Sequence, residues 1–208
     1  MISNKSVKLL KSIKMQKIKN IIQASIDVKT QILADDKILQ TVQDCVNIIV
    51  TAFEKGNKVL FCGNGGSASD AQHLAAEFSG RFYTDRDALP AEALHCNTSY
   101  ITAVANDYSY DVIYSRLLKG IGNPGDILVG FSTSGNSKNI VKAFETAKEK
   151  GMTTIAFTGA SGGKLKPLSD QLINIPSDDT PRIQESHITL GHIICQLVEE
   201  IYFAETND

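Results

Sequence analysis

The sequence has little surplus of charge of either sign. It carries 21 Lys and Arg residues against 23 Asp and Glu residues, which gives a formal net charge of −2 over 208 residues. A surplus of positive charge attracts proteins to the phosphate backbone of nucleic acids, and this chain lacks one. The balance argues against a protein that binds DNA or RNA through its overall charge, so we expect no nucleic-acid partner.

Long apolar runs are also missing. No run of about 18 apolar residues occurs, so we expect no membrane-spanning helix and no membrane partner. Lysines between Lys8 and Lys19 interrupt the N-terminal segment, so it lacks the uninterrupted apolar core of a secretory signal. The four cysteines are scattered and lack the paired spacing of a zinc ribbon or a redox dithiol. These features predict a cytoplasmic protein with reduced, buried thiols.

The first 55 residues contain a helical pattern. Apolar side chains recur at steps of three and four, as at Ile18, Ile22 and Ile26, and no Pro or Gly occurs before Gly56. Such spacing forms an apolar stripe along one face of a helix. We therefore expect an N-terminal helical arm over residues 1–55, whose stripe packs against another copy of the chain, followed by a domain over residues 56–208.

Short β-branched runs alternate with Gly- and Ser-rich loops and helical patterns after residue 56. Because strands separated by helices need crossover connections, their sheet must be parallel and covered on both faces. The expected fold class is α/β, a three-layer αβα sandwich around a five-stranded parallel sheet. Strands are expected at 58–62, 91–95, 126–131, 153–157 and 171–175, and helices at 70–78, 101–107, 112–119, 138–150 and 182–203.

Two loops after expected strands have the composition of ligand-binding loops. The glycine loop, residues 63–67 (GNGGS), lets the backbone approach a ligand closely because glycine has no side chain. The hydroxyl loop, residues 132–137 (STSGNS), gathers four hydroxyls at a helix start, where free backbone amides favour an anion. Each loop alone equally fits an ordinary strand-to-helix turn, but two such loops in one parallel sheet favour a phosphorylated ligand. Neither matches a nucleotide signature, so we expect no nucleotide cofactor.

A third group of candidate residues lies on two of the expected helices. His73 and Glu77 stand four residues apart on one helix face, and Gln184 and His192 lie two turns apart on the closing helix. If both helices open toward one cleft, these side chains supply an acid–base pair or a site for a divalent metal. The spacing does not choose between these uses, and His192 also fits a buried core histidine. Arg81 could contact a phosphate or sugar, or be a solvated surface arginine.

The chain resembles a known family through four segments: CGNGGSASDAQHLAAEFSGRF, FSTSGNSKNI, TGASGGKL and RIQESHITLGHIICQLVEE. The resemblance is to the sugar isomerase (SIS) domain proteins, most closely the phosphoheptose isomerases, and runs from about residue 20 to residue 203. It implies a flavodoxin- or Rossmann-like SIS sandwich and a homotetramer with active sites between subunits. The implied reaction converts D-sedoheptulose 7-phosphate to D-glycero-D-manno-heptose 7-phosphate, a precursor of bacterial surface heptoses in lipopolysaccharide or capsule.

The resemblance also implies roles for single residues. Glu77 matches the catalytic base of the family, and His192 matches the acid on the opposite side of the substrate. Zinc is the implied cofactor, one ion per subunit, and the ligands of some members match His73, Glu77, Gln184 and His192. The positions that match substrate-binding residues are Asn64, Gly65, Gly66, Ser67, Glu77, Arg81, Asn97, Ser132, Thr133, Ser134, Ser137 and Gln184.

One position departs from the family pattern. Where the family has an aspartate that meets the sugar hydroxyls, this chain has Asn97, within the run HCNTS at residues 95–99. An amide keeps an acceptor and adds donors, but it cannot take a proton or carry charge. Substrate specificity is therefore the property that this change puts in question.

Two non-catalytic relatives of these isomerases provide the alternative function. One binds the bacterial replication initiator and lacks the acid–base pair that Glu77 and His192 supply here. The other senses sugar phosphates and carries a DNA-binding segment, and the basic stretch of about 20 residues at the start of this chain is too short to fold as one. The retained pair favours an enzyme.

Overall fold

A five-stranded parallel sheet forms the centre of the computed structural model, which describes residues 15–204. The strands lie in the order β2-β1-β3-β4-β5, and every neighbouring pair is parallel. The order reverses between β1 and β3, and ligands of such sheets bind in the crevice beyond the carboxyl ends of the strands at this point. The strands are β1 (Val59–Cys62), β2 (Ala91–Ala93), β3 (Ile127–Ser132), β4 (Thr153–Thr158) and β5 (Gln171–Asn174).

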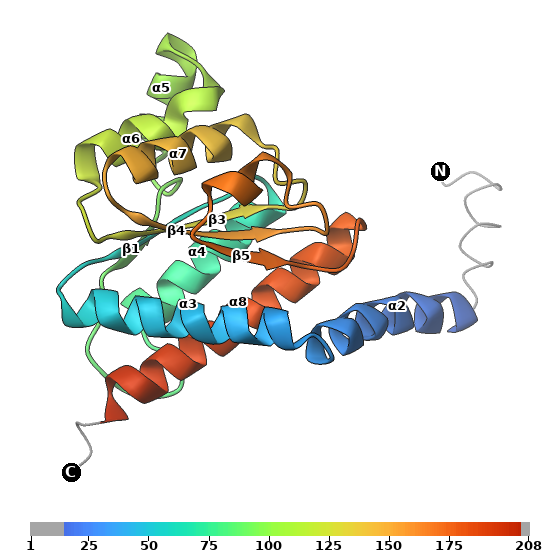
Figure 1. Ribbon diagram of the computed structural model, residues 1–208. Coiled ribbons are helices and arrows are strands. Elements are labelled where there is room, and N and C mark those ends of the chain that lie inside the picture. The colour runs from blue at the N-terminus through green and yellow to red at the C-terminus, as the bar shows by residue number, and fades with distance from the viewer. Residues whose placement is uncertain (1–14, 205–208) are drawn as a thin grey trace, which may run out of the picture.

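Helices cover both faces of the sheet (Figure 1). Strand residues alternate between two cores: Phe61 and Val129 pack on one side, and Leu60 and Leu128 on the other. The two-residue period of a strand produces this alternation, and the predicted αβα sandwich is confirmed. One face carries α3 (Asp36–Glu54), α4 (Gly66–Ser79) and α8 (Thr180–Tyr202), and the other carries α5 (Thr98–Asp107), α6 (Ile113–Ile121) and α7 (Lys138–Glu149).

The N-terminal helical segment divides into two helices with different surroundings. α2 (Met15–Leu33) projects from the sandwich, whereas α3 packs along it and buries eight residues (Figure 1). Asp35 separates them, because its carboxylate accepts hydrogen bonds from the backbone N–H groups of Lys37 and Ile38 and so caps α3. The sandwich therefore includes α3, which belongs to the segment predicted as a helical arm. Residues 1–14 of the predicted arm lie outside the described residues.

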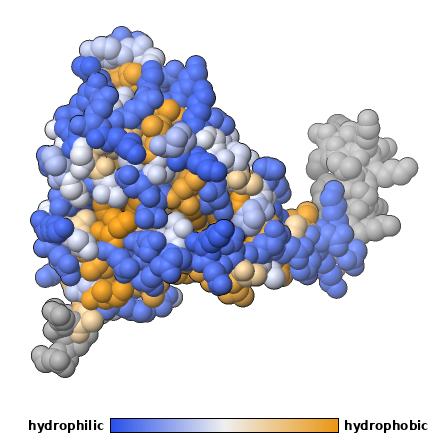
Figure 2. Space-filling model, in the orientation of Figure 1, coloured by the Kyte–Doolittle hydropathy of each residue, from blue (hydrophilic) through white to orange (hydrophobic). Residues whose placement is uncertain are grey.

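The apolar stripe of α2 is exposed to solvent in the single chain. Ile18, Ile21, Ile22 and Ile26 are between 42% and 56% exposed. Arg182 holds the helix to α8 by donating a hydrogen bond to the carbonyl of Ile21, at 2.8 Å. Apolar patches also interrupt the hydrophilic surface of the face shown in Figure 2. Within residues 15–204, every helix is too short or too polar to cross a membrane.

Candidate functional site

The glycine loop and the hydroxyl loop lie at the carboxyl ends of adjacent strands, β1 and β3. Gly65, with a φ of +56°, turns the chain from β1 into α4, which begins earlier than the predicted residue 70. Neither Gly65 nor Ser137 caps the following helix with a side-chain hydrogen bond. Uncapped helix starts present backbone N–H groups and the positive end of the helix dipole, which favour an anion.

Packing against a second glycine-rich segment holds the hydroxyl loop in shape. The hydroxyls of Ser132 and Ser137 lie 3.0 Å apart. A Cβ atom on Gly135 would lie 2.2 Å from the carbonyl oxygen of Gly162, so only glycine allows this approach. The carbonyl of Gly135 also accepts a hydrogen bond from the backbone N–H of Leu165, at 3.1 Å. The loop is thus held in one shape and presents hydroxyls and backbone amides, which are the groups that bind a phosphate.

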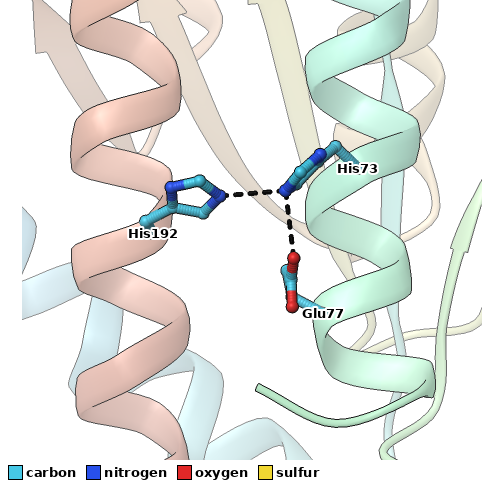
Figure 3. A group of neighbouring side chains, drawn as sticks. All are labelled: His73, Glu77 and His192. Atoms are coloured by element: carbon cyan, nitrogen blue, oxygen red, sulfur yellow. Dashed lines mark hydrogen bonds and ion pairs between the residues drawn. The ribbon is translucent and has the colours of Figure 1, made fainter. Parts of the chain in front are cut away.

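Three ionisable side chains meet between α4 and α8 and form what we call the His–Glu–His cluster: His73, Glu77 and His192 (Figure 3). The Nε2 atom of His73 lies 3.0 Å from Oε1 of Glu77 and 3.0 Å from Nε2 of His192. One potential ligand atom from each residue lies within 4.8 Å of the others. The structure therefore brings together three of the four residues that the spacing placed on two helix faces, and Gln184 lies elsewhere.

A glycine allows the two helices to approach each other at this cluster. A Cβ atom on Gly191 would lie 2.4 Å from Cδ1 of Leu74. Leu74 follows His73 in the chain and Gly191 precedes His192, so the close contact lies beside the two imidazoles. A larger side chain at residue 191 would force Leu74 or the helices to move.

The cluster is open to solvent on one side. The side chain of His73 is 51% exposed and that of Glu77 is 23% exposed. Burial, and then the neighbouring His73, lower the pKa of His192, while Glu77 acts in the opposite direction. Two imidazole nitrogens and a carboxylate oxygen are a donor set that zinc takes in proteins. The side chains present therefore fit a zinc ion and also fit an acid–base pair.

Gln184 lies at the other end of α4. A Cβ atom on Gly66 would lie 2.7 Å from Nε2 of Gln184, so the amide is in contact with the glycine loop. Gly66 precedes His73 by about 10 Å along the helix axis, given a rise of about 1.5 Å per residue. The structure thus places Gln184 beside a predicted substrate-binding position, and its role as a zinc ligand stays a prediction.

Asn97 and Arg81 are both exposed at the edge of the sandwich. Asn97 caps α5, because its Oδ1 atom accepts a hydrogen bond of 3.0 Å from the backbone N–H of Tyr100. Its two amide N–H groups and the second lone pair of Oδ1 are what it can offer a ligand. Arg81 follows α4 and precedes Phe82, whose ring centroid lies 5.7 Å from that of His192. Arg81 therefore belongs to the end of α4 that carries the His–Glu–His cluster.

A buried ion pair that the sequence did not reveal fixes the loop after α4. Arg86 donates through Nε to Glu199 at 2.7 Å, and both side chains are 3% exposed. Glu199 also accepts hydrogen bonds from the backbone N–H groups of residues 82–84. Arg86 donates to the carbonyl of Glu77 at 2.8 Å. The pair therefore joins the end of α4 that carries Glu77 to the helix that carries His192.

Replacing Glu199 should weaken folding in a pH-dependent way. Burial alone would raise the pKa of Glu199, but hydrogen bonds from residues 82–84 and Arg86 outweigh it and lower the pKa to about 2. A lowered carboxyl pKa stabilises the fold above the unfolded-state value, about 4.3, and this contribution is lost as pH falls toward 2. Glu199→Gln should lower the free energy of unfolding at pH 7 by about 3 kcal/mol and flatten its decline between pH 4.3 and 2. Urea denaturation at several pH values measures both effects.

The exposed neighbour Glu200 provides the matched control for this prediction. Glu200→Gln should leave the unfolding free energy within about 0.5 kcal/mol of the parent. Equal stability of the Glu199 and Glu200 variants at pH 7 would contradict the role assigned to the buried pair.

Comparison with known proteins identifies relatives over most of the chain. The model of the SIS domain family matches residues 22–159. A phosphoheptose isomerase of Aneurinibacillus thermoaerophilus is 53% identical over 186 residues, 89% of this chain and 94% of that protein. One from Clostridium acetobutylicum is 51% identical over 187 residues, 90% of this chain and 95% of the relative.

A solved structure supports the same relationship. The structure of a phosphoheptose isomerase from Francisella tularensis superposes with a TM-score of 0.86 at 35% sequence identity, and the match covers 89% of this chain and 98% of that chain. The matched residues 22–159 contain the two loops, His73 and Glu77, and the relatives match about nine tenths of the chain. The chain therefore belongs to the SIS-domain family and, within it, to the phosphoheptose isomerases, which are enzymes that isomerise sugar phosphates.

Proposed function

We propose that this chain interconverts D-sedoheptulose 7-phosphate and D-glycero-D-manno-heptose 7-phosphate. The observation that carries the proposal is the meeting of Glu77 and His192, with His73 between them, in a chain about half identical to phosphoheptose isomerases. An aldose–ketose isomerisation needs two positioned groups that move protons, and a carboxylate and an imidazole serve this purpose. The hydroxyl loop would hold the phosphate.

The proposed mechanism assigns one proton transfer to each group. Glu77 removes a proton from C1 of the ketose, and His192 gives a proton to the C2 oxygen, which yields an enediol. Glu77 then returns the proton to C2 while the proton on the C1 oxygen leaves to His192, so that the aldose forms and both groups regain their first state. Gln184, in contact with Gly66, and the N–H groups of Asn97 would bind sugar oxygens.

A second copy of the chain would complete this site. Gly66 and Glu77 lie near opposite ends of α4, about 16 Å apart along its axis, and one side of the His–Glu–His cluster is open. A homotetramer whose subunits meet at the exposed stripe of α2 would cover such surfaces and exclude water from the reacting carbons. In this proposal residues 1–55 supply the contact between subunits, although α3 also belongs to the sandwich.

Zinc is the proposed metal, held by His73, Glu77 and His192. Gln184 contacts Gly66 in the structure, so it would become a further ligand only after its side chain turns toward the cluster. When bound, it would polarise the substrate carbonyl and stabilise negative charge on the enediol oxygens. Purified chain, freed of metal, should bind one Zn²⁺ per subunit in a titration with a chromogenic chelator. His73→Gln should weaken binding at least about 100-fold, because a ligand is removed and not merely its support.

Cys96→Ser is the control for this titration, since Cys96 is the exposed cysteine and could bind zinc adventitiously. It should leave the stoichiometry and affinity unchanged. Unaltered affinity in the His73 variant would contradict the proposed zinc site. The other cysteines, Cys45, Cys62 and Cys195, are buried and unpaired, which supports the proposal that the enzyme works in the reducing cytoplasm.

A substrate panel tests the proposed specificity. The chain is incubated with sedoheptulose 7-phosphate, with shorter ketose phosphates and with the unphosphorylated sugar, each with and without Zn²⁺. We expect turnover of the heptulose phosphate and at least about 100-fold less turnover without the phosphate, whose charge-assisted contacts the loops supply. Preference for a shorter ketose phosphate would refute the heptose assignment and implicate Asn97 in the altered choice.

A further inference from the structure

The side chain of Asn64, in the glycine loop, takes part in a network that joins three segments of the chain. Its amide pairs with that of Asn139 in α7: Nδ2 of Asn64 donates at 2.9 Å, and Nδ2 of Asn139 donates back at 2.8 Å. The hydroxyl of Tyr110, in the short helix η1 (Tyr110–Val112), donates to Oδ1 of Asn64 at 3.1 Å. The network therefore links the glycine loop to the start of α7 and to the segment between α5 and α6.

This network leaves Asn64 with a single unused polar group. An asparagine amide has two N–H donors and a carbonyl oxygen with two lone pairs. The lone pairs face Asn139 and Tyr110, and one N–H is given to Asn139. What remains for a ligand is one N–H, a donor that suits an oxygen of a sugar or phosphate.

Asn139 is itself held in one orientation. It is 3% exposed, and its Oδ1 atom also accepts a hydrogen bond of 3.0 Å from the backbone N–H of Ile140. Because it lies in the first turn of α7, two residues after Ser137, it connects the glycine loop to the hydroxyl loop. Nearby, the hydroxyl of Tyr114 donates to the carbonyl of Gly63, which fixes the backbone beside Asn64.

We propose that Asn139 and Tyr110 are positioning residues that orient the Asn64 amide so that it offers one N–H to the sugar phosphate. The proposal rests on the proposed function for the identity of the ligand. Neither residue belongs to the loops that the sequence pattern singled out. Their effect on the ligand passes through Asn64, which distinguishes them from residues that touch the substrate.

A double-mutant cycle tests this role. Tyr110 is 51% exposed, so Tyr110→Phe removes one hydroxyl without disturbing the core. We expect it to raise KM and the Kd for sedoheptulose 7-phosphate by about threefold to tenfold, the value of one hydrogen bond, with kcat unchanged. In an Asn64→Ala background the same change should cost less than about twofold, because the residue through which it acts is gone.

Asn139→Ala should weaken binding by about tenfold or more in the parent and by much less in the Asn64→Ala background. If the Asn139→Ala variant does not fold, the double-mutant cycle of Tyr110 and Asn64 tests the positioning role by itself. Tyr108→Phe is the matched control: Tyr108 is 60% exposed and stacks under Arg116, and its variant should bind as the parent does. An equal loss for Tyr110→Phe in both backgrounds, or no loss in the parent, would overturn the proposal.

Calorimetric binding and turnover are measured on the same samples, so that two failures can be told apart. Binding of sedoheptulose 7-phosphate without turnover would refute the proposed function. The Kd values of the double-mutant cycle would still test the positioning role. Turnover with additive losses would refute the positioning role alone. Absence of binding by every sugar phosphate of the panel would overturn both.

Discussion

Glu77→Gln should abolish isomerase activity, lowering kcat by about 10²–10⁴-fold while the fold and the oligomeric state remain those of the parent. An amide has nearly the shape of the carboxylate, but it cannot take a proton from C1 of the ketose. The side chain lies on the outer part of α4, 23% exposed, so its replacement leaves the core intact. Activity on sedoheptulose 7-phosphate, circular dichroism and light scattering measure the three properties.

Glu145→Gln, an exposed change on α7, is the control and should retain parental activity. If the Glu77 variant turned over substrate within about tenfold of the parent rate, Glu77 would not be the catalytic base. A variant that loses activity together with its helical content would show a structural role instead.

His192→Gln should reduce kcat by a comparable factor, about 10²–10⁴-fold. The imidazole lies 3.0 Å from His73 and beside Phe82, and it is only partly buried, so it lines the open cluster and does not fill the core. A loss below about tenfold would instead indicate a histidine retained for packing. Gln196→Ala, one turn further along α8, should leave kcat unchanged.

A comparison with His73→Gln at saturating Zn²⁺ separates the two uses of His192. If His192 acts only as a metal ligand, both variants should recover alike when zinc is in excess. If it also moves a proton, His192→Gln should stay inactive under conditions in which His73→Gln recovers. Matching recovery would contradict the assignment of His192 as the acid.

Patterns of local sequence were sufficient to predict the sheet and its helices. The expected strand at 153–157 is a short run with β-branched residues, and it differs from β4, Thr153–Thr158, by one residue. The alternation of strand and helix then dictated a parallel, doubly covered sheet. Periodicity reports an apolar face and not its partner, so it could not distinguish α3, which packs on the sheet, from α2, whose face is exposed.

Helical spacing placed His73 and Glu77 on one face and Gln184 and His192 on another, but only the structure shows that the two helices meet at His73, Glu77 and His192. The ion pair of Arg86 with Glu199 could not be anticipated, since its members lie 113 residues apart and belong to no periodic pattern. His187, close to Gln184 in the sequence, is a second case in which local sequence does not show what a side chain contacts. It is fully buried, with Nε2 3.2 Å from the carbonyl oxygen of Thr158, and takes no part in the cluster.

The most direct test is a proton NMR assay of the purified chain with sedoheptulose 7-phosphate and Zn²⁺ in D₂O. An enediol mechanism predicts that glycero-manno-heptose 7-phosphate appears with deuterium at C2, because the proton held by a solvent-accessible Glu77 exchanges before it returns to carbon. The same assay with Glu77→Gln should show neither aldose nor deuterium. No aldose from the parent chain, or equal aldose formation by the Glu77 variant, would contradict the account.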